Sequence, residues 1–339
     1  MPGPYNGIRT QKGGRTTERT EILPLFGGLA LFLFGMDRMS EALQQAAGER
    51  LRRALAALTR TPLTGALAGM VVTAVMQSSS ATTVMVIGFV SAGLLELPQA
   101  VAVIFGANIG TTVTAQLLAF RVEEMLGLVL FGGFFLCAVA RTKRGRQMGT
   151  AVFSFGLLFA GMEQIQSVVE PLALRPEWMA QVREKPLWGL LLGLGMTLVV
   201  QSSSATIGVL QGVARQAGPD GVHSLLGLAG AVPVLLGDNV GTTITAILAA
   251  AGGTRDAKRA AAAHCCFNLS GSLVCLLALP WFVQLVELLP PEGEELEMIA
   301  RQIANAHTLF NALCTLIWLP LTPLMVRLVT TLVPEKRTE

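Results

Sequence analysis

Two stretches of the chain decide its fold: LTGALAGMVVTAVMQSSSATTVMVIGFV (residues 63–90) and LWGLLLGLGMTLVVQSSSATIGVLQGVA (residues 187–214). They align without a gap at an offset of 124 residues (187 − 63), and each holds Gln-Ser-Ser-Ser inside an apolar run. Two further blocks repeat in the same order: LFLFGMDRM (from Leu31) with LLFAGMEQI (from Leu157), and GANIGTTVTA (from Gly106) with GDNVGTTITA (from Gly237). Three blocks in one order at nearly one offset indicate an internal duplication.

The chain is poor in charge for its length. Of its 339 residues 52% are hydrophobic and only 14% are charged, whereas about 25% of a soluble domain is charged. Almost no charge falls inside long segments such as Leu63–Glu96, Pro186–Val213 and Ser224–Gly253. Such segments match a bilayer core of about 30 Å. We therefore predict an all-α, multi-pass protein of the cell membrane.

The charged loops predict that the two copies have opposite orientations. Basic residues precede the first copy, in Glu49–Arg60, and follow the second, in Arg255–Arg259. The positive-inside rule places both segments, with Arg141–Arg146, in the cytoplasm. Equivalent loops then lie on opposite sides, as in inverted-topology repeats. The same assignment puts the basic N-terminal tail outside, against the rule.

Five segments follow from this pass along the chain. They are a disordered basic tail (1–20), a first repeat with a following helix (21–146), a second repeat (147–260), C-terminal transmembrane helices (261–333) and a short tail (334–339). A shorter echo, AHCCFN (from Ala263) and AHTLFN (from Ala306), is interpreted as a separate repetition. Its His264 and His307 each stand four residues before an Asn, on one helix face, which predicts interhelical hydrogen bonds.

Each copy contains pieces too short to be ordinary spans. Leu63–Met76 and Thr82–Leu95 each have about 14 residues, and a full helical span needs about 20. The polar motif between them predicts a re-entrant hairpin. The next run, Ala100–Phe120, contains Asn108–Thr112 (NIGTT), which predicts a broken helix. Irregular backbone at membrane depth is tolerated where it is buried in protein or lines a wet cavity. Matching breaks in both copies therefore point to a transport site.

The residues at these breaks suit a pair of ions. A helix that restarts after a break presents free N–H groups and the positive end of its dipole, which favours an oxyanion such as phosphate. Unwound carbonyls and hydroxyl oxygens suit a hard cation such as Na+. Asp238 lies where the first copy has Ala107, and a carboxylate at membrane depth is a functional hypothesis by default. Asp238 would ligate a cation or carry a coupled proton. Asp37 and Glu163, equivalent residues near helix ends, either reach the interface or take part in ion coupling.

The motifs resemble those of the type II sodium–phosphate cotransporter family. The matching pieces are VMQSSSATT (from Val75), GANIGTTVTA, VVQSSSATI (from Val199), GDNVGTTITA and the two AHxxFN segments. The resemblance implies Na+-driven symport of inorganic phosphate by alternating access, with the substrate between the two QSSS motifs. Phosphate would be bound by Gln77, Ser78, Ser79, Ser80, Gln201, Ser202, Ser203 and Ser204. Na+ would be bound by Gln77, Asn108, Thr111, Thr112, Gln201, Asp238, Asn239, Thr242 and Thr243.

The expected partners are phosphate, Na+ and the lipid bilayer, with no nucleic acid and no cofactor; monomer and homo-oligomer stay open. Residues alone leave rival functions. Hydroxyl and amide donors do not select phosphate, so a carrier of another oxyanion or a dicarboxylate is an alternative. An ion channel with a polar filter is another, although two opposed hairpins favour a carrier. An enzyme is not expected, because the sequence has no GxSxG elbow, P-loop or HExxH and places no base near the serines.

Overall fold

The computed structural model describes residues 16–47, 59, 61–120, 125–172, 181–218, 220–290 and 293–335. Within these ranges every named element is a helix, and one isolated bridge joins Ala217 to Ser224. The helices are α1 (Thr16–Ala47), α3 (Pro62–Met76), α4 (Ser79–Ser91), α5 (Leu97–Leu118), α6 (Leu126–Val139), α7 (Lys143–Leu172), α9 (Pro186–Val200), α10 (Ser203–Ala214), α11 (Gly227–Gly241), α12 (Thr243–Ala250), α13 (Arg255–Leu277), α14 (Leu279–Glu287), α15 (Glu295–Trp318) and α16 (Thr322–Leu332). The all-α prediction is confirmed for the described part of the chain.

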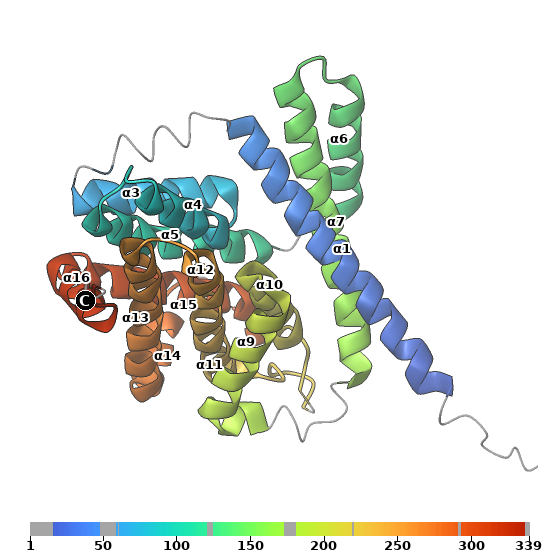
Figure 1. The fold of residues 1–339 in the computed structure, drawn as a ribbon. Helices are drawn as coiled ribbons and strands as arrows, with labels where there is room; N and C mark the ends of the chain where they lie inside the picture. The colour runs from blue at the N-terminus through green and yellow to red at the C-terminus, as the bar shows by residue number, and fades with distance from the viewer. Residues whose placement is uncertain are drawn as a thin grey trace, which may run out of the picture.

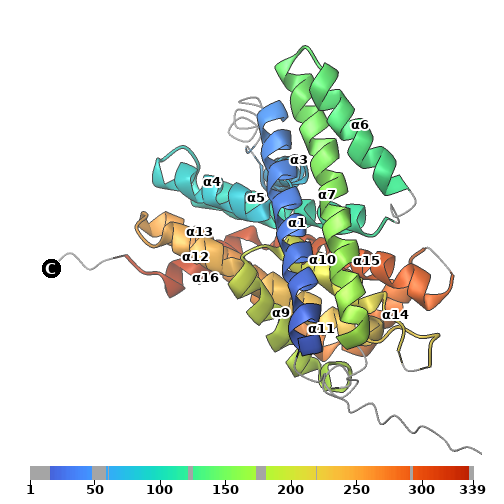
Figure 2. The same ribbon diagram turned by 90° about the vertical axis from the view of Figure 1, so that its right-hand side faces the viewer.

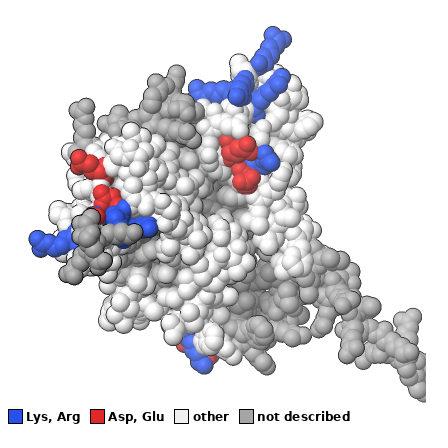
Figure 3. All heavy atoms as spheres, in the orientation of Figure 1, with Lys and Arg blue, Asp and Glu red and all other residues white. Residues whose placement is uncertain are grey.

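Several helices have the length and composition to cross a bilayer. Four qualify alone: Leu97–Leu118, Lys143–Ile165, Gly227–Ala250 and Arg255–Leu277. Helices α15 and α16 qualify together, although they are bent by 87° where they meet. On the face seen in Figure 3 the charges lie in a few small clusters separated by wide uncharged surface, and one cluster of Lys and Arg lies at the turn between α6 and α7. The protein is therefore a multi-pass membrane protein.

The two copies fold alike at a helix crossing built on glycine. Helix α5 crosses α3 at Gly69 and Gly106, and α11 crosses α9 at the equivalent Gly193 and Gly237 (Figure 1). A Cβ atom added to any of these four glycines would overlap a backbone carbonyl of the partner helix. Small residues at such crossings let apolar helices approach closely in a membrane. The duplication seen in the sequence is thus also a duplication of packing.

The C-terminal helices α13 and α15 join the two copies. Ser272 on α13 donates to the carbonyl of Leu236 on α11, at 3.2 Å. Thr315 on α15 donates to the carbonyl of Phe105 on α5, also at 3.2 Å. The Phe105 ring stacks on Phe267 of α13 with ring centroids 4.9 Å apart. Helices α5, α11, α13 and α15 therefore form one continuous core.

Two long helices, α1 and α7, lie beside this core together with the shorter α6 (Figures 1 and 2). Helices α1 and α7 cross closely at Gly28, Gly35 and Gly161. Phe32 of α1 is fully buried, and its ring lies against Gly208 of α10. This contact connects the long helices to the second Gln-Ser-Ser-Ser segment.

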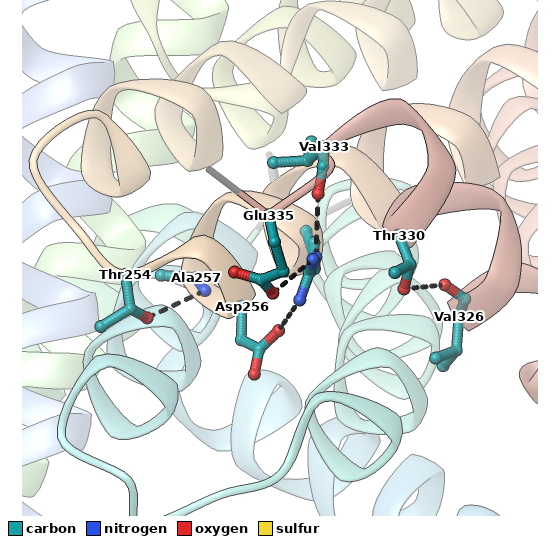
Figure 4. Close-up of polar contacts among 8 residues, drawn as sticks. Thr254, Asp256, Ala257, Val326, Thr330, Val333 and Glu335 are labelled. Carbon is teal, nitrogen blue, oxygen red and sulfur yellow. Dashed lines mark hydrogen bonds and ion pairs between the residues drawn. The ribbon is translucent and has the colours of Figure 1, made fainter. Parts of the chain in front are cut away.

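A buried arginine holds the end of α16 against the start of α13. The Arg259 guanidinium donates to two carboxylates, those of Asp256 at 2.8 Å and Glu335 at 2.7 Å. Its Nε atom donates to the carbonyl of Val333 at 3.0 Å. Figure 4 shows Asp256, Val333 and Glu335 converging on this guanidinium. In the same view the Thr254 hydroxyl, the N-cap of α13, accepts a hydrogen bond from the N–H of Ala257. Arg259, which belongs to a basic segment predicted to be cytoplasmic, therefore also stabilises the contact between α13 and the end of α16.

The predicted break at Asn108–Thr112 is wrong for the first copy, because α5 runs through it without interruption. In the second copy, α11 and α12 are separated only at Thr242. Polar side chains are satisfied inside the helix: Asn108 Nδ2 donates four residues back at 2.9 Å, and Thr112 Oγ1 three residues back at 2.8 Å. Gly110 serves the close approach to α3 rather than a turn. Polarity alone therefore did not require an irregular backbone.

Other boundaries need restating. Helix α1 begins at Thr16, inside the stretch predicted as a disordered tail, and residues 1–15 lie outside the described part. The predicted boundaries at 146 and 260 fall inside α7 and α13. Most loop residues used for topology (48–58, 60, 121–124 and 173–180) also lie outside the described part. The inversion of the repeats and the re-entrant hairpins stay predictions.

Candidate functional site

Both Gln-Ser-Ser-Ser motifs interrupt their helices with the same backbone geometry. Gln77 closes α3 at φ 55° and ψ 25°, and Gln201 closes α9 at φ 54° and ψ 26°. Among the described residues these two are the only non-glycine residues with positive φ. A side chain in this left-handed region costs about 1–2 kcal/mol. The same unfavourable conformation at two equivalent positions is a reason to look for function there.

The serine after each glutamine starts the next helix. Ser78 and Ser202 have extended backbones, and their Oγ atoms accept the N–H of Ala81 at 3.1 Å and of Ala205 at 3.3 Å. This cap satisfies one of the free donors at each helix start. The first two N–H groups of α4 and of α10 have no acceptor within their helix. Each break therefore offers backbone donors, serine hydroxyls and the positive end of a helix dipole.

A pair of threonines bridges each break, and the sequence reasoning missed them. Thr73 of α3 donates to Thr82 of α4 at 2.9 Å, and the hydroxyls of Thr197 and Thr206 lie 3.0 Å apart between α9 and α10. All four side chains are buried. The sequence does contain a signal for them, because Thr73 and Thr82 recur as Thr197 and Thr206 at the offset of 124 residues. These bonds hold the two half-helices in register across the strained glutamine.

The two glutamines differ in exposure. Gln77 is only 5% exposed, its Oε1 atom accepts from Thr114 at 3.0 Å, and its Nε2 atom donates to the carbonyl of Ala74. Gln201, in the equivalent place, is exposed. Backbones that match in both copies thus present one shielded and one accessible amide.

Each break-bearing segment also contacts the other copy. Thr245 on α12 donates to Ser80 of the first motif at 3.2 Å. Gln211 on α10 donates from Nε2 to the carbonyls of Ala115 on α5 and Ala300 on α15, at 3.0 Å each. The hydrogen bonds of the described residues include none between the two Gln-Ser-Ser-Ser motifs themselves. The structure therefore brings the first motif and helix α10, which follows the second motif, against the other repeat.

Asp238 is the charged residue of this region. It is fully buried at the end of α11, and its Oδ1 atom accepts from Thr197 at 2.6 Å. Its Oδ2 atom is buried and has no hydrogen-bond partner among the described residues. A buried carboxylate is costly unless it is paired with a cation or neutralised. The hydrogen bond between Thr206 and Thr197 thus continues to the Asp238 carboxyl group, whose second oxygen has no hydrogen-bond partner among the described residues.

The remaining candidates divide into buried and exposed groups. The predicted sodium ligands of the Asn-x-Gly-Thr-Thr segments are all buried: Asn108, Thr111, Thr112, Asn239, Thr242 and Thr243. The predicted interhelical bonds of the two histidines are confirmed: His264 contacts Asn108 and His307 contacts Asn239, each at 3.3 Å. Asp37 on α1 and Glu163 on α7 are exposed, in keeping with the interface interpretation. The described residues include no His, Cys, Asp or Glu cluster suited to a metal ion.

Comparison with known proteins finds matches over most of the chain. The family described as Na+/Pi-cotransporter matches residues 31–167 and 174–313. The Bacillus subtilis protein YqeW is 34% identical over 275 residues, 80% of this chain and 87% of that protein. Escherichia coli YjbB, whose name describes inorganic phosphate export, is 28% identical over 258 residues. That alignment covers 75% of this chain but only 46% of YjbB, so the chain spans about half of that relative.

An animal relative matches over a shorter stretch. Sodium-dependent phosphate transport protein 2A of Rattus norvegicus is 36% identical over 105 residues, 30% of this chain and 16% of that protein. No solved structure matches the chain. The similarity to a sodium–phosphate cotransporter family expected from the motifs is confirmed.

Proposed function

The chain belongs to the Na+/Pi-cotransporter family, and from this premise we propose that it carries inorganic phosphate across the membrane in symport with Na+. The proposal has three parts. Phosphate binds at the paired Gln-Ser-Ser-Ser breaks, Na+ binds beside it on side-chain oxygens, and the two sides of the membrane gain access in turn.

The twin breaks carry the proposal for phosphate. Each has serine hydroxyls and a capped helix start whose first N–H groups have no acceptor within the helix, and the second also presents the exposed amide of Gln201. Phosphate accepts many hydrogen bonds at once, and helix N-termini favour anions. The donors are neutral and few charges lie near them, so binding would be reversible, as transport requires.

Asp238 supports the proposal for Na+. Its unpartnered Oδ2 atom and the hydroxyl of Thr197 are oxygen donors in a buried place. A bound Na+ would neutralise the carboxylate and offset the charge of phosphate at the adjacent break. Gln77, Gln201 and the oxygens of Asn108, Thr111, Thr112, Asn239, Thr242 and Thr243 are the further candidates.

The unequal exposure of Gln77 and Gln201 supports alternating access. A carrier binds its substrate between two halves and opens to one side at a time. One shielded and one exposed amide, on backbones of equal geometry, is the pattern expected of a state open on one side.

Phosphate uptake into proteoliposomes tests the proposal directly. Labelled phosphate is followed with an inward Na+ gradient, with the gradient reversed, and with choline in place of Na+. We expect uptake that requires Na+ and follows the direction of its gradient. Phosphate movement that ignores Na+ would refute the coupling and favour a facilitated exporter, the direction that the name of YjbB describes. Competition by sulfate, arsenate or a dicarboxylate decides between phosphate and the rival substrates.

Substitution of Asp238 tests the cation site. The first copy has Ala107 at this position, so Asp238→Ala reproduces a side chain that the fold already accommodates once. We expect the Na+ concentration for half-maximal uptake to rise by about tenfold or more, because one ligand is lost. An unchanged Na+ dependence would place the cation elsewhere.

A further inference from the structure

Two histidines make the same contact in the two halves of the protein. His264 on α13 and His307 on α15 are both 2% exposed. The Nε2 atom of His264 lies 3.3 Å from Oδ1 of Asn108, and that of His307 lies 3.3 Å from Oδ1 of Asn239. The partners are 156 and 68 residues apart in the chain. The histidine of each AHxxFN segment therefore contacts the equivalent asparagine of a different copy of the duplication.

The orientation of each asparagine is fixed by its own helix. Asn108 Nδ2 donates to the carbonyl of Ile104 at 2.9 Å, and Asn239 Nδ2 donates to that of Leu235 at 3.0 Å. With the amide nitrogen engaged in this way, the amide oxygen faces the imidazole and must accept. Each histidine thus carries its proton on Nε2, which fixes the tautomer by geometry.

The rest of the AHxxFN motif holds the histidine in place. Asn268 donates from Nδ2 to the backbone carbonyl of His264 at 3.1 Å, and Asn311 does the same for His307 at 3.0 Å. All of these groups are buried. A buried histidine that bonds an amide oxygen, with its own backbone fixed by the next turn, has little freedom to move.

We propose that His264 and His307 are positioning residues for the coupling cation. An amide oxygen has two lone pairs: the imidazole N–H takes one, which fixes the amide group and leaves the other for a cation. Partners that orient a metal ligand commonly change metal affinity by about 10–100-fold when removed. The inference rests on the proposed function, because it requires that Asn108 or Asn239 bind Na+.

Paired variants separate positioning from simple helix packing. His264→Met and His307→Met keep an apolar side chain of similar reach but remove the donor. His264→Gln and His307→Gln restore an N–H donor close to the place of Nε2. Ser272→Ala on α13 and Thr315→Val on α15 are matched controls, since each removes an interhelical hydrogen bond that involves no asparagine.

Two quantities are measured in proteoliposomes: the Na+ concentration for half-maximal uptake and the KM for phosphate at saturating Na+. We expect each Met variant to raise the Na+ value about tenfold and to leave the phosphate KM within about twofold. The Gln variants should return the Na+ value to within about threefold of the wild type, and the controls should leave it unchanged. A second measurement needs no transport: the rise in thermal midpoint of the purified protein when NaCl replaces choline chloride, without phosphate. We expect this rise to be smallest in the Met variants and close to that of the wild type in the Gln variants and the controls.

The outcomes separate this inference from the proposed function. A wild type without Na+-dependent uptake refutes the proposed function. If the wild type depends on Na+ but the Met variants keep its half-maximal concentration, the positioning role alone is overturned. Gln variants as impaired as Met variants, or controls that shift the Na+ value equally, would also overturn it, since packing alone would explain the loss. Should a Met variant not fold, the Gln variant and the control on the same helix still decide.

Discussion

Replacing Gln201 with glycine should separate stability from transport at the second break. Gln201 has φ 54°, a conformation that costs a side-chain-bearing residue about 1–2 kcal/mol and glycine almost nothing. Glycine also loses more entropy on folding, about 0.5–1 kcal/mol. The Gln201 side chain is exposed, so its removal sacrifices little packing. We therefore expect Gln201→Gly to gain about 0.5–1 kcal/mol in unfolding free energy.

The equivalent variant in the first copy should not gain stability. Gln77→Gly relieves the same strain but removes two bonds, the one that Thr114 donates to Oε1 at 3.0 Å and the one that Nε2 donates to the carbonyl of Ala74. Loss of the two bonds costs about 2 kcal/mol, so the variant should be less stable than the wild type by about 1 kcal/mol. Transport should fall in both variants by about 10- to 100-fold, because an amide that bonds a charged ligand contributes about 1.5–3 kcal/mol.

The assay combines thermal unfolding in detergent with phosphate uptake in proteoliposomes. We expect the midpoint of Gln201→Gly to rise by about 2 °C and that of Gln77→Gly to fall by a similar amount, with uptake reduced in both. A lower midpoint for Gln201→Gly would contradict the strain argument. Normal uptake by both variants would remove the glutamines from the substrate site.

Three further predictions concern packing, charge and pH. Gly237→Val should place a side chain against the α9 backbone, cost about 3 kcal/mol and sharply reduce the monodisperse peak in size-exclusion chromatography. Arg259→Met should lower the thermal midpoint by the equivalent of about 1 kcal/mol, because its carboxylate partners are 49% and 72% exposed and can return to water. In the loop before α11, the hydrogen bond from His223 is the main reason that the pKa of Asp220 is lowered to about 2, and that bond also raises the pKa of His223. Asp220→Asn should therefore lower the His223 pKa toward its ordinary value, and NMR titration of the ring signals would measure the change.

The glycine variant has a matched control, and the other two predictions have readouts that can be interpreted directly. Gly88→Ala on α4 adds a Cβ where nothing lies within 4 Å, so it should be tolerated; equal damage from it and from Gly237→Val would refute the crossing argument. For Arg259, an unchanged midpoint would show that the contact to the end of α16 is dispensable. His223 is the exposed one of the chain's three histidines, so its signals can be assigned. Because its pKa is raised, the pair stabilises the loop fully below the unfolded histidine pKa and loses this effect as pH rises through the folded value.

Much of the site was predictable because it repeats. The Gln-Ser-Ser-Ser motifs stood out as polar residues in long apolar runs, and the duplication marked them as equivalent. The bridging threonines carried the same signal at Thr73 and Thr197 and were overlooked, since single hydroxyls in membrane helices are common. The interruption expected at Asn108–Thr112 failed for a physical reason: short polar side chains bond the carbonyls of their own helix.

The sequence by itself determined the class of the protein, its duplication and the helix breaks at the two Gln-Ser-Ser-Ser motifs, because apolar runs and repeats are local patterns along the chain. Only the tertiary structure decided that Gln77 is shielded while Gln201 is exposed, and that Asp238 is buried with one unused oxygen. It also paired the histidine of each AHxxFN segment with the asparagine of one copy, through contacts between residues up to 156 positions apart. Such contacts depend on how helices cross, and the close crossings depend on glycines whose neighbours lie far away in the sequence.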